Sequence, residues 1–470
     1  MLRRSFLRHA AAVPLLGAPA RPTRIRGRVS STLGERGLGG IVVSDGLSSV
    51  VTGSDGDYEI QSNASARFVF VSTPREVALP VKFYRPLRFD ASGEATVSFS
   101  LAPADDDGEA HRFLVFGDTQ IADREDAKKL HEATTLIAEQ TKTEDFAFGL
   151  TCGDLVDDAL DLFDDYEAAV ERLGVPFFQV VGNHDLDEPV GSIRNARTYE
   201  RHFGPTHYSF NRGAVHYVSL NDVFWLGNGY VGFVSDDQLQ WLESDLAHVA
   251  PGAPVVVFAH VPFLCTVSER IGGKIAPNEA QVTNRDRVLS LLEPFAGRFI
   301  TAHTHENEHV FHGDVHEHVL GTVCGAWWTG PICWDGTPNG YHVFDIDGES
   351  ISWHYRPTGR SPDEQFELYP PYADPSRPEV LANVWNWDPD WKVVWAEDGN
   401  VRGEMARARG VDPLARSLYL GPEKPLGNPD WVEPILTDHL FHAPVSKDAK
   451  KVTVEATDPF GRVYVDSLVL

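Results

Sequence analysis

The sequence predicts an α/β core between two β-rich domains, and three observations lead to this prediction. In the middle of the chain, apolar strand-like runs alternate with stretches of helical periodicity. On both sides of this region the chain has short strands separated by turn residues, with few helical patterns. Five of the central strand-like runs end on residues that can bind metal ions, which is where α/β sheets collect their ligands.

The core is predicted at 111–355, with helices at 124–142, 160–174 and 236–249. We expect Asp236 to cap the last of these helices. Residues 21–104 are predicted to form an N-terminal β-sandwich, because runs such as "VVTGSDGDYEI" (50–60) combine alternation with turn residues. Residues 356–470 are predicted to form a second β-rich domain, in which Pro, Trp and β-branched residues replace the helical patterns.

The composition fits a folded protein of several domains. Of its 470 residues, 42% are hydrophobic and 23% are charged, which is enough to bury a large core. The 68 acidic residues outnumber the 41 basic residues, and the formal net charge is -27. A charge of this sign repels polyanions, so we expect no nucleic-acid polymer as a partner. The sequence makes no prediction of the oligomeric state.

The first 20 residues have the order of an export signal. Arg3 and Arg4 precede a short apolar stretch, and Ala18-Pro19-Ala20 offers small residues for cleavage. The paired arginines are similar to the twin-arginine signal of bacteria, which predicts a periplasmic or extracellular protein. An ordinary basic N-terminus is the alternative. No later segment is apolar for long enough to form a transmembrane helix.

The four cysteines are too few and too scattered for a disulfide scaffold or a zinc site of the CxxC type. Cys324 and Cys333 could pair after export, and buried thiols are the alternative. A run of acidic residues at 157–167 could attract metal, but a solvated helix face explains it better.

The central strand-like runs end on carboxylates, amides and imidazoles. The candidate residues are Asp118 and Gln120 after "FLVF", Asp154 after "FAFGLTCG", Asn183, His184 and Asp185 after "FFQVVG", His260 after "VVVFA", and His303 and His305 after "RFITA". One such residue alone would be ordinary turn chemistry, but five runs that end alike predict a metal site. Oxygen and imidazole ligands without thiolate favour Mn, Fe, Zn or Mg. The number of ligands predicts two divalent ions rather than one.

These blocks resemble the calcineurin-like metallophosphoesterase superfamily. The matching motifs are G-D at 117–118, G-D-x-x-D at 153–157, G-N-H-D at 182–185, H-x-P at 260–262 and H-x-H at 303–305. The flanks resemble the small N-terminal β domain and the C-terminal domain of an exported bacterial branch. The resemblance implies a core of two packed mixed β-sheets flanked by helices.

The resemblance also implies the role of each residue. Asp118, Gln120, Asp154 and His305 would hold the first metal, and Asp154, Asn183, His260 and His303 the second, with Asp154 bridging them. His184 would face the substrate and act on the transition state or the leaving oxygen, and Asp185 would orient His184. The implied reaction is hydrolysis of a small phosphomonoester or phosphodiester by a hydroxide held between the ions.

Gln120 departs from the commonest family pattern, which has Asp-x-His at this place. An amide oxygen is a neutral and weaker donor than an imidazole, so we expect a more labile first metal and a preference for Mn or Mg over Zn, with Mn favoured. The alternative is that Gln120 binds no metal and holds only a water molecule.

A second class of function is a surface or binding protein that keeps the fold without turnover. The full set of ligands argues against it. For substrate selection the candidates are the loop 187–212, with Arg194, Arg197 and Arg201, and the segment 324–342. In that segment Trp327, Trp328 and Trp334 could stack on a substrate or belong to the core, and we expect at least one in the core.

Overall fold

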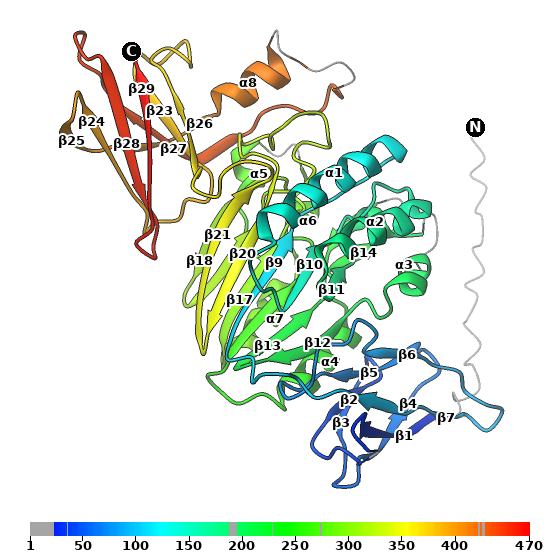
Figure 1. Ribbon diagram of the computed structural model, residues 1–470. Coiled ribbons are helices and arrows are strands. Elements are labelled where there is room, and N and C mark those ends of the chain that lie inside the picture. Colours follow the sequence, from blue (N-terminus) through cyan, green and yellow to red (C-terminus); the bar gives the residue numbers. More distant parts are fainter. Residues whose placement is uncertain are drawn as a thin grey trace, which may run out of the picture.

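The computed structural model describes residues 23–34, 36–187, 195–227, 229–272, 275–421, 424 and 428–470. Figure 1 shows an N-terminal β-rich part, a central α/β core and a C-terminal β-rich part, with the core between the other two. The predicted fold class is therefore confirmed. The predicted signal at 1–20 lies outside the described residues. The domain boundaries given above stay a prediction.

The N-terminal part consists of two small sheets. One has the order β4-β1-β7 with β8 also paired to β1, and the other has the order β3-β2-β5-β6. The strands are β1 (Thr23–Ser31), β2 (Val42–Ser44), β3 (Ser49–Val51), β4 (Asp57–Ser62), β5 (Phe68–Ser72), β6 (Tyr84–Pro86), β7 (Glu94–Thr96) and β8 (Phe99–Leu101). Tyr58 and Ile60 alternate along β4 with exposed residues. They share one apolar core with Val43 and Val69 of the other sheet, so the two sheets form a sandwich.

The first sheet of the core has the order β11-β10-β9-β20-β21. Its strands are β9 (Ala110–Phe116), β10 (Phe148–Cys152), β11 (Phe177–Val180), β20 (Gly340–Asp347) and β21 (Ser350–Pro357). The strands β9, β10 and β11 are parallel, whereas β20 is antiparallel to β9 and to β21. Every residue of β10 is buried, as expected for a parallel strand covered on both faces.

The second sheet of the core has the order β12-β13-β16-β17-β19-β18. Its strands are β12 (Tyr208–Arg212), β13 (Val215–Ser219), β16 (Pro254–Phe258), β17 (Ala296–Thr301), β18 (Glu308–His312) and β19 (Val315–Val319). The four inner strands are parallel, and the two edge strands are antiparallel to their neighbours. Both sheets of the core are therefore mixed.

Helices flank the two core sheets (Figure 1). They are α1 (Arg124–Thr141), α2 (Phe163–Val170), α3 (Arg197–His202), α4 (Asp236–Leu246), α5 (Val267–Arg270), α6 (Pro277–Ala280) and α7 (Arg285–Leu292), with 3-10 turns η1 (Leu160–Leu162), η2 (Glu171–Leu173) and η3 (Asn183–Asp185) and a hairpin of β14 (Val223–Trp225) and β15 (Tyr230–Gly232). The three predicted helices are confirmed, although α4 is capped by the side chain of Ser235 rather than by Asp236. Within the described residues no helix is long and apolar enough to cross a membrane.

The C-terminal part has two four-stranded sheets with the orders β22-β23-β27-β26 and β25-β24-β28-β29. Its elements are β22 (Phe366–Tyr369), β23 (Val380–Val384), β24 (Lys392–Glu397), β25 (Asn400–Glu404), β26 (Ala406–Val411), α8 (Pro413–Leu420), β27 (Leu436–Ala443), β28 (Lys451–Thr457) and β29 (Val463–Val469). Val384, Trp391 and Val454 join both sheets in one core. This part is therefore β-rich, as predicted.

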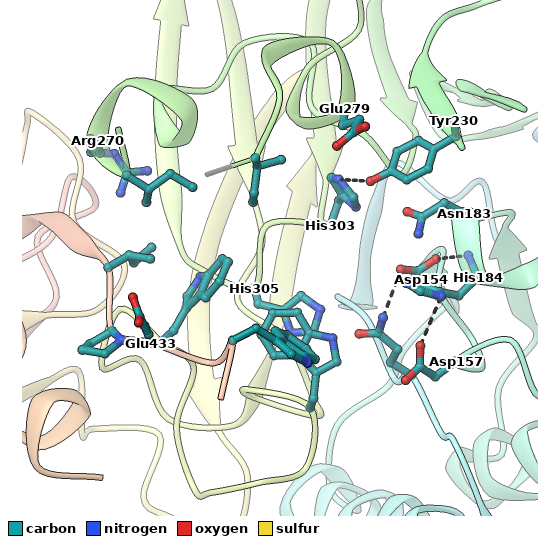
Figure 2. A pocket seen from close by; sticks show the side chains of 18 of the residues that line it. Asp154, Asp157, Asn183, His184, Tyr230, Arg270, Glu279, His303, His305 and Glu433 are labelled. Atoms are coloured by element: carbon teal, nitrogen blue, oxygen red, sulfur yellow. Dashed lines mark hydrogen bonds and ion pairs between the residues drawn. The ribbon is translucent and has the colours of Figure 1, made fainter. Parts of the chain in front are cut away.

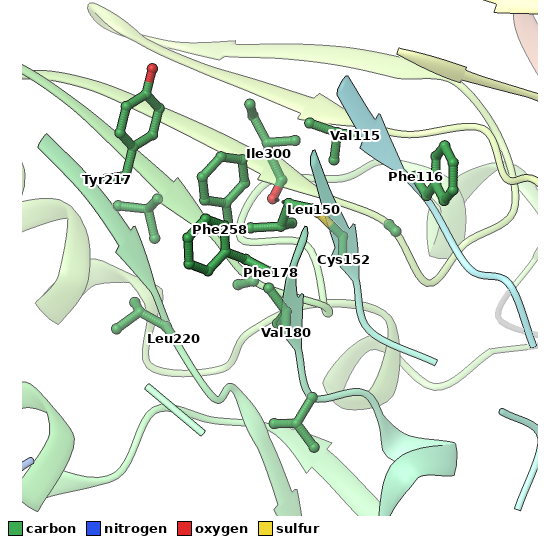
Figure 3. Packing of buried hydrophobic residues seen from close by; sticks show 14 of the residues in the cluster. Val115, Phe116, Leu150, Cys152, Phe178, Val180, Tyr217, Leu220, Phe258 and Ile300 are labelled. Carbon is green, nitrogen blue, oxygen red and sulfur yellow. Dashed lines mark hydrogen bonds between the residues drawn. The ribbon is translucent and has the colours of Figure 1, made fainter. Parts of the chain in front are cut away.

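The two core sheets pack through aromatic rings. Phe113 of β9 is stacked between Phe148 and Phe344 of its own sheet, with ring centroids 4.8 and 5.0 Å away. It also meets Tyr217 and Phe258 of the second sheet edge-on, at 5.5 and 6.0 Å. Figure 3 shows Tyr217 and Phe258 within this packing. Phe113 thus joins the two layers that carry the strand ends described below.

We expect Phe113→Ala to destabilise the core by about 3 to 5 kcal/mol, because it leaves a cavity between two sheets that cannot close up. Denaturant unfolding followed at the transition of the core measures the loss. Val401, which is 73% exposed on the C-terminal part, provides the control Val401→Ala, with an expected change below about 0.5 kcal/mol. A loss of similar size in both variants would contradict the central role of Phe113.

Candidate metal centre

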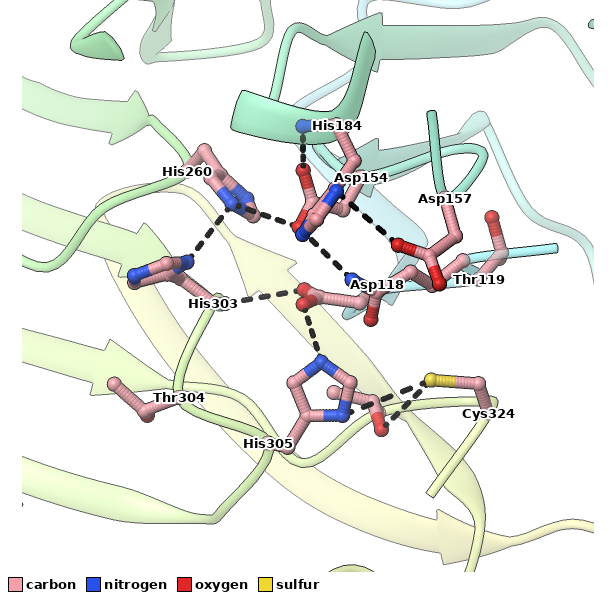
Figure 4. Close-up of polar contacts among 12 residues, drawn as sticks. Asp118, Thr119, Asp154, Asp157, His184, His260, His303, Thr304, His305 and Cys324 are labelled. Carbon is pink, nitrogen blue, oxygen red and sulfur yellow. Dashed lines mark hydrogen bonds and ion pairs between the residues drawn. The ribbon is translucent and has the colours of Figure 1, made fainter. Parts of the chain in front are cut away.

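The predicted site residues all follow parallel strands of the two core sheets. Asp118 and Gln120 follow β9, Asp154 follows β10, Asn183, His184 and Asp185 follow β11, His260 follows β16, and His303 and His305 follow β17. The carboxyl ends of these strands open onto one crevice where the two sheets meet. Figure 4 shows that side chains from both sheets converge there. The structure therefore brings together residues that are almost 190 positions apart, 118 to 305.

Four potential ligand atoms lie together around His260. Its Nε2 is 3.3 Å from Asp154 Oδ2, 3.0 Å from Asn183 Oδ1 and 3.1 Å from His303 Nδ1. Ligand atoms that are each about 2.1 Å from a tetrahedral ion lie about 3.4 Å from one another. The spacing of these four atoms therefore suits one divalent ion.

Asp118, Gln120 and His305 form a second cluster beside the first. Asp118 Oδ2 is 2.9 Å from His305 Nε2, but the two atoms are not aligned as a hydrogen bond, and this oxygen has no hydrogen-bond partner among the described residues. Gln120 Oε1 is also buried without a partner there, while its Nε2 lies 3.4 Å from Asp154 Oδ2. Buried oxygens of this kind are costly unless something satisfies them. The residues present therefore fit a centre for two cations.

The three histidines are each anchored on the side away from the clusters. His260 and His305 donate from Nδ1 to backbone carbonyl oxygens, at 2.8 and 2.7 Å, which leaves the lone pair on Nε2. His303 is held through Nε2, 3.1 Å from the hydroxyl of Tyr230, and presents Nδ1. Anchored imidazoles with one free nitrogen are typical of metal ligands.

The backbone of the site is strained. Nine non-glycine residues of the described chain have positive φ, and four of them are Gln120, Asp154, His303 and His305, with φ of 36°, 47°, 69° and 51°. The left-handed region costs an L-residue about 1 to 2 kcal/mol, and such strain collects at functional sites. The loops are therefore shaped for the side chains they present.

Two of the glycines that precede site residues allow the loops to touch. A Cβ on Gly182 would lie 2.1 Å from the backbone nitrogen of Asp154. A Cβ on Gly153 would lie 2.6 Å from Nδ1 of His260, and Gly153 also has a φ of 86°. The glycines of the G-N-H-D and G-D-x-x-D blocks are needed because other loops of the site pass directly against them.

Asp185 does not orient His184, so this prediction is wrong. Both oxygens of the buried Asp185 carboxylate accept backbone N–H groups, from Leu155 and Val156 at 2.9 and 3.2 Å and from Gly182 at 2.8 Å. These backbone groups hold the carboxylate, and the His184 ring contacts other carboxylates instead. Asp185 instead ties the loop after β10 to the loop after β11.

The His184 ring is held by two acidic residues that the sequence analysis assigned to a solvated face. Its Nδ1 lies 2.9 Å from Asp158 Oδ1 and 3.1 Å from Asp157 Oδ1. Burial lowers the pKa of His184, but Asp154, Asp158 and Asp157 outweigh burial and raise it to about 9. These carboxylates therefore favour the protonated form of the His184 imidazole. The sequence signal that could have revealed this contact is the position of Asp157 as the last residue of the G-D-x-x-D block.

The charges of the clusters depend on one another. Burial opposes ionisation of Asp154, but His260 and His184 outweigh burial and hold its pKa well below the usual range. Burial likewise opposes the charged form of His260, and Asp154 overcomes this and raises the imidazole pKa to about 10. Burial and the neighbouring His260 lower the pKa of His303 to about 3. Without an ion, a proton on His260 balances Asp154, and metal binding displaces such a proton.

The site opens into a cavity of about 910 Å³. Its walls include Trp327 and Trp334, whereas the Trp328 indole donates to the carbonyl of Thr119 and packs against the core. Arg197 and Arg201 are not among its described lining residues, and Arg194 lies outside the described residues, so a role of the loop 187–212 in substrate selection stays a prediction.

No cysteine is among the described residues that line the cavity. Cys324 and Cys333 are both buried and free, so the alternative of buried thiols holds in this structure.

Three further histidines, His309, His316 and His318, also bring ring nitrogens close together. The half-buried Arg298 donates from Nη1 to His316 Nδ1 and His318 Nε2, both at 2.8 Å, and His309 Nδ1 is 2.9 Å from His316 Nε2. The guanidinium thus occupies imidazole lone pairs, and its charge repels a cation. This cluster solvates a half-buried arginine.

Fold and site together define a class of protein, an α/β sandwich with a candidate dinuclear metal centre between its sheets. Three family models match the sequence: the N terminal of calcineurin-like phosphoesterase at residues 23–104, calcineurin-like phosphoesterase at 111–307, and the C terminal of calcineurin-like phosphoesterase at 317–464. The chain belongs to the calcineurin-like phosphoesterases, as its motifs predicted. Members of this family use a dimetal centre.

Solved structures resemble about half of the chain. A dimetal phosphatase from Danio rerio is 16% identical, with a TM-score of 0.39, over 53% of this chain and 96% of that one. A purple acid phosphatase from yellow lupin seeds is 16% identical, with a TM-score of 0.39, over 53% of this chain and 52% of that one. GAP50 of Plasmodium, described as the anchor in the inner membrane complex, is 13% identical, with a TM-score of 0.38, over 53% and 85%. No protein with curated annotation matches significantly.

We expect Asp185→Asn to lower stability by about 1 to 3 kcal/mol, because the new amide group would turn a donor toward the N–H of Gly182. Thermal unfolding in the presence of a chelator measures this loss apart from any change in metal binding. Asp157→Asn is the control, since the Asp157 carboxylate meets the His184 ring rather than the backbone. Equal stability of the two variants would contradict the role given to Asp185.

Proposed function

We propose that this chain is an exported two-metal phosphoesterase that hydrolyses a small phosphomonoester or phosphodiester. One observation carries the proposal: Asp154 lies between the two clusters, with Oδ2 3.3 Å from His260 Nε2 and 3.4 Å from Gln120 Nε2. A carboxylate between two sets of ligands is suited to bridge two ions. Both clusters contribute residues to one cavity, where a substrate can reach them.

In this proposal one ion is held by Asp118, Gln120, Asp154 and His305, and the other by Asp154, Asn183, His260 and His303. The unpartnered oxygens of Asp118 and Gln120 and the anchored imidazoles support the assignment. Two such ions would activate water near neutral pH and neutralise phosphoryl oxygens. The neutral Gln120 oxygen favours Mn over Zn at the first position.

His184 is proposed to protonate the leaving oxygen. The two carboxylates that hold Nδ1 leave Nε2 free for a substrate in the cavity. The same carboxylates keep the imidazole protonated, as a general acid requires, since they contribute to its raised pKa.

Two measurements on the purified protein test the proposed function. Elemental analysis is expected to find two divalent ions per chain. A screen with Mn²⁺ is expected to find hydrolysis of phosphomonoesters or phosphodiesters. Absence of bound metal together with absence of hydrolysis would favour the binding-protein alternative.

We expect His184→Asn to lower kcat for an alkyl phosphoester by about 100-fold or more, because the alkoxide leaves without its proton. The loss for a nitrophenyl ester is expected to be much smaller, since nitrophenolate is stable as an anion. Steady-state kinetics with both esters measure the difference. Equal losses for the two leaving groups would mean that His184 does not protonate the leaving oxygen.

Gln120→His is expected to raise the ratio of bound Zn to bound Mn about tenfold, because imidazole is the better zinc ligand. Elemental analysis after dialysis against an equimolar mixture of both metals measures the ratio. Gln140 of α1 lies outside the site and offers the control Gln140→His. An unchanged ratio in Gln120→His would show that Gln120 is not a ligand.

The proposed export is supported by the sequence of residues 1–20 alone. Replacement of Arg3 and Arg4 by lysine is expected to retain the precursor in the cytoplasm of a bacterial host. Cell fractionation measures this, and unimpaired export of the variant would overturn the twin-arginine assignment.

A further inference from the structure

The cavity reaches from the metal centre to the C-terminal part of the chain. Figure 2 shows Asp154 and His184 on one side of the pocket and Arg270 and Glu433 on the other. The C-terminal part contributes several lining residues, among them Val411, Trp431, Ile435 and Leu436. A volume of about 910 Å³ is typical of a site that encloses an organic ligand, so a phosphoryl group alone leaves most of it empty.

Indole rings form the wall nearest to the metal centre. Trp327 stacks on His305 with ring centroids 3.9 Å apart and planes inclined by 15°. Trp431 stands across Trp327 at 4.6 Å and 80°, and 59% of Trp431 is exposed. His305 thus covers one face of Trp327, and the exposed Trp431 is nearly perpendicular to Trp327, so a planar ring that stacks on Trp431 in this corner meets Trp327 edge-on.

The residues that follow Trp431 along the cavity wall are held in place by contacts within the protein. Arg270 donates from Nη1 to the carbonyl of Leu436 at 2.6 Å. The backbone N–H of Ile435 donates to the carbonyl of Trp334 at 3.1 Å. Ile435 and Trp334 also share a small apolar cluster with Tyr419 of α8. Because Ile435 and Leu436 are fixed in this way, this side of the cavity loses less conformational freedom when a rigid group binds.

The charges around the cavity disfavour a second anionic group. Asp157, Asp158, Glu279 and Glu433 all line it. The guanidinium of Arg270 also lines it, but its Nη2 is already 2.6 Å from the buried carboxylate of Glu306. A further phosphate or carboxylate held beside Glu279 or Glu433 would therefore meet a carboxylate and no unpaired guanidinium.

We propose that the substrate is a phosphoester whose alcohol carries an uncharged aromatic ring, and that this ring binds in the corner between Trp327 and Trp431. The inference rests on the proposed function and names the substrate class of the same site. The C-terminal part thereby becomes half of the substrate-binding site.

Binding of two phosphonates, which cannot be hydrolysed, tests the proposal on the full chain loaded with Mn²⁺. Isothermal titration is expected to give a Kd for phenylphosphonate about tenfold below that for methylphosphonate. Trp431→Ala is expected to abolish this difference, and Trp431→Phe to retain most of it. Trp387→Ala is the matched control, because Trp387 lies on the same C-terminal part under Arg407 and is not among the lining residues.

The outcomes separate the inference from the proposed function. Equal affinity for the two phosphonates, or a preference that is retained in Trp431→Ala, overturns the inference but does not affect the proposed phosphoesterase function. Loss of the preference in Trp387→Ala as well would mean that the C-terminal part is only structurally required, and it also overturns the inference. Failure of both phosphonates to bind, with no ester hydrolysed, overturns the proposed function and the inference with it.

Discussion

Two buried carboxylates, Asp118 and Asp154, impose the constraint on which the site depends. In the described chain their ion-pair distances are to histidines, His305 and His260. A neutral imidazole offers no charge, and a protonated imidazole gives up its lone pair. A proton on the imidazole balances the carboxylate when no ion is bound, and a cation that binds the lone pair has to balance it instead, because burial of an uncompensated charge is costly. Each imidazole is also hydrogen-bonded through the ring nitrogen that faces away from the carboxylates, and this contact turns the other nitrogen toward them.

The two-layer core explains how such a costly arrangement persists. Parallel strands from both sheets end at one crevice, so each loop carries one or two ligands and no loop has to carry all of them. Aromatic packing around Phe113 fixes the sheets against each other. This packing holds the left-handed backbone of residues such as Asp154 and His303, which would relax in a softer framework. The strain in the loops is therefore balanced by the core beneath them.

The fold class and the set of converging residues could be predicted because both depend on local patterns. A strand that ends on Asp or His is visible in the sequence, and the parallel arrangement of the strands brings their carboxyl ends together. The partners of individual side chains could not be predicted in this way. Asp185 follows His184 directly, yet its carboxylate turns to the backbone of the neighbouring loop, and Asp158 reaches the His184 ring instead. The same holds for Trp431, which meets Trp327 from a distant part of the chain.

The strand β27 begins at Leu436, which is also the last described residue along the chain that lines the cavity. The strands that carry the candidate metal ligands and the residues of this wall belong to different hydrophobic clusters. Substitutions in the short segment before β27 alter the shape offered to a substrate and leave the strained loops of the core untouched. The exposed Trp431 of this segment can thus be replaced without a change in the candidate ligands on the other side of the cavity, which separates the shape of the cavity from its candidate metal centre.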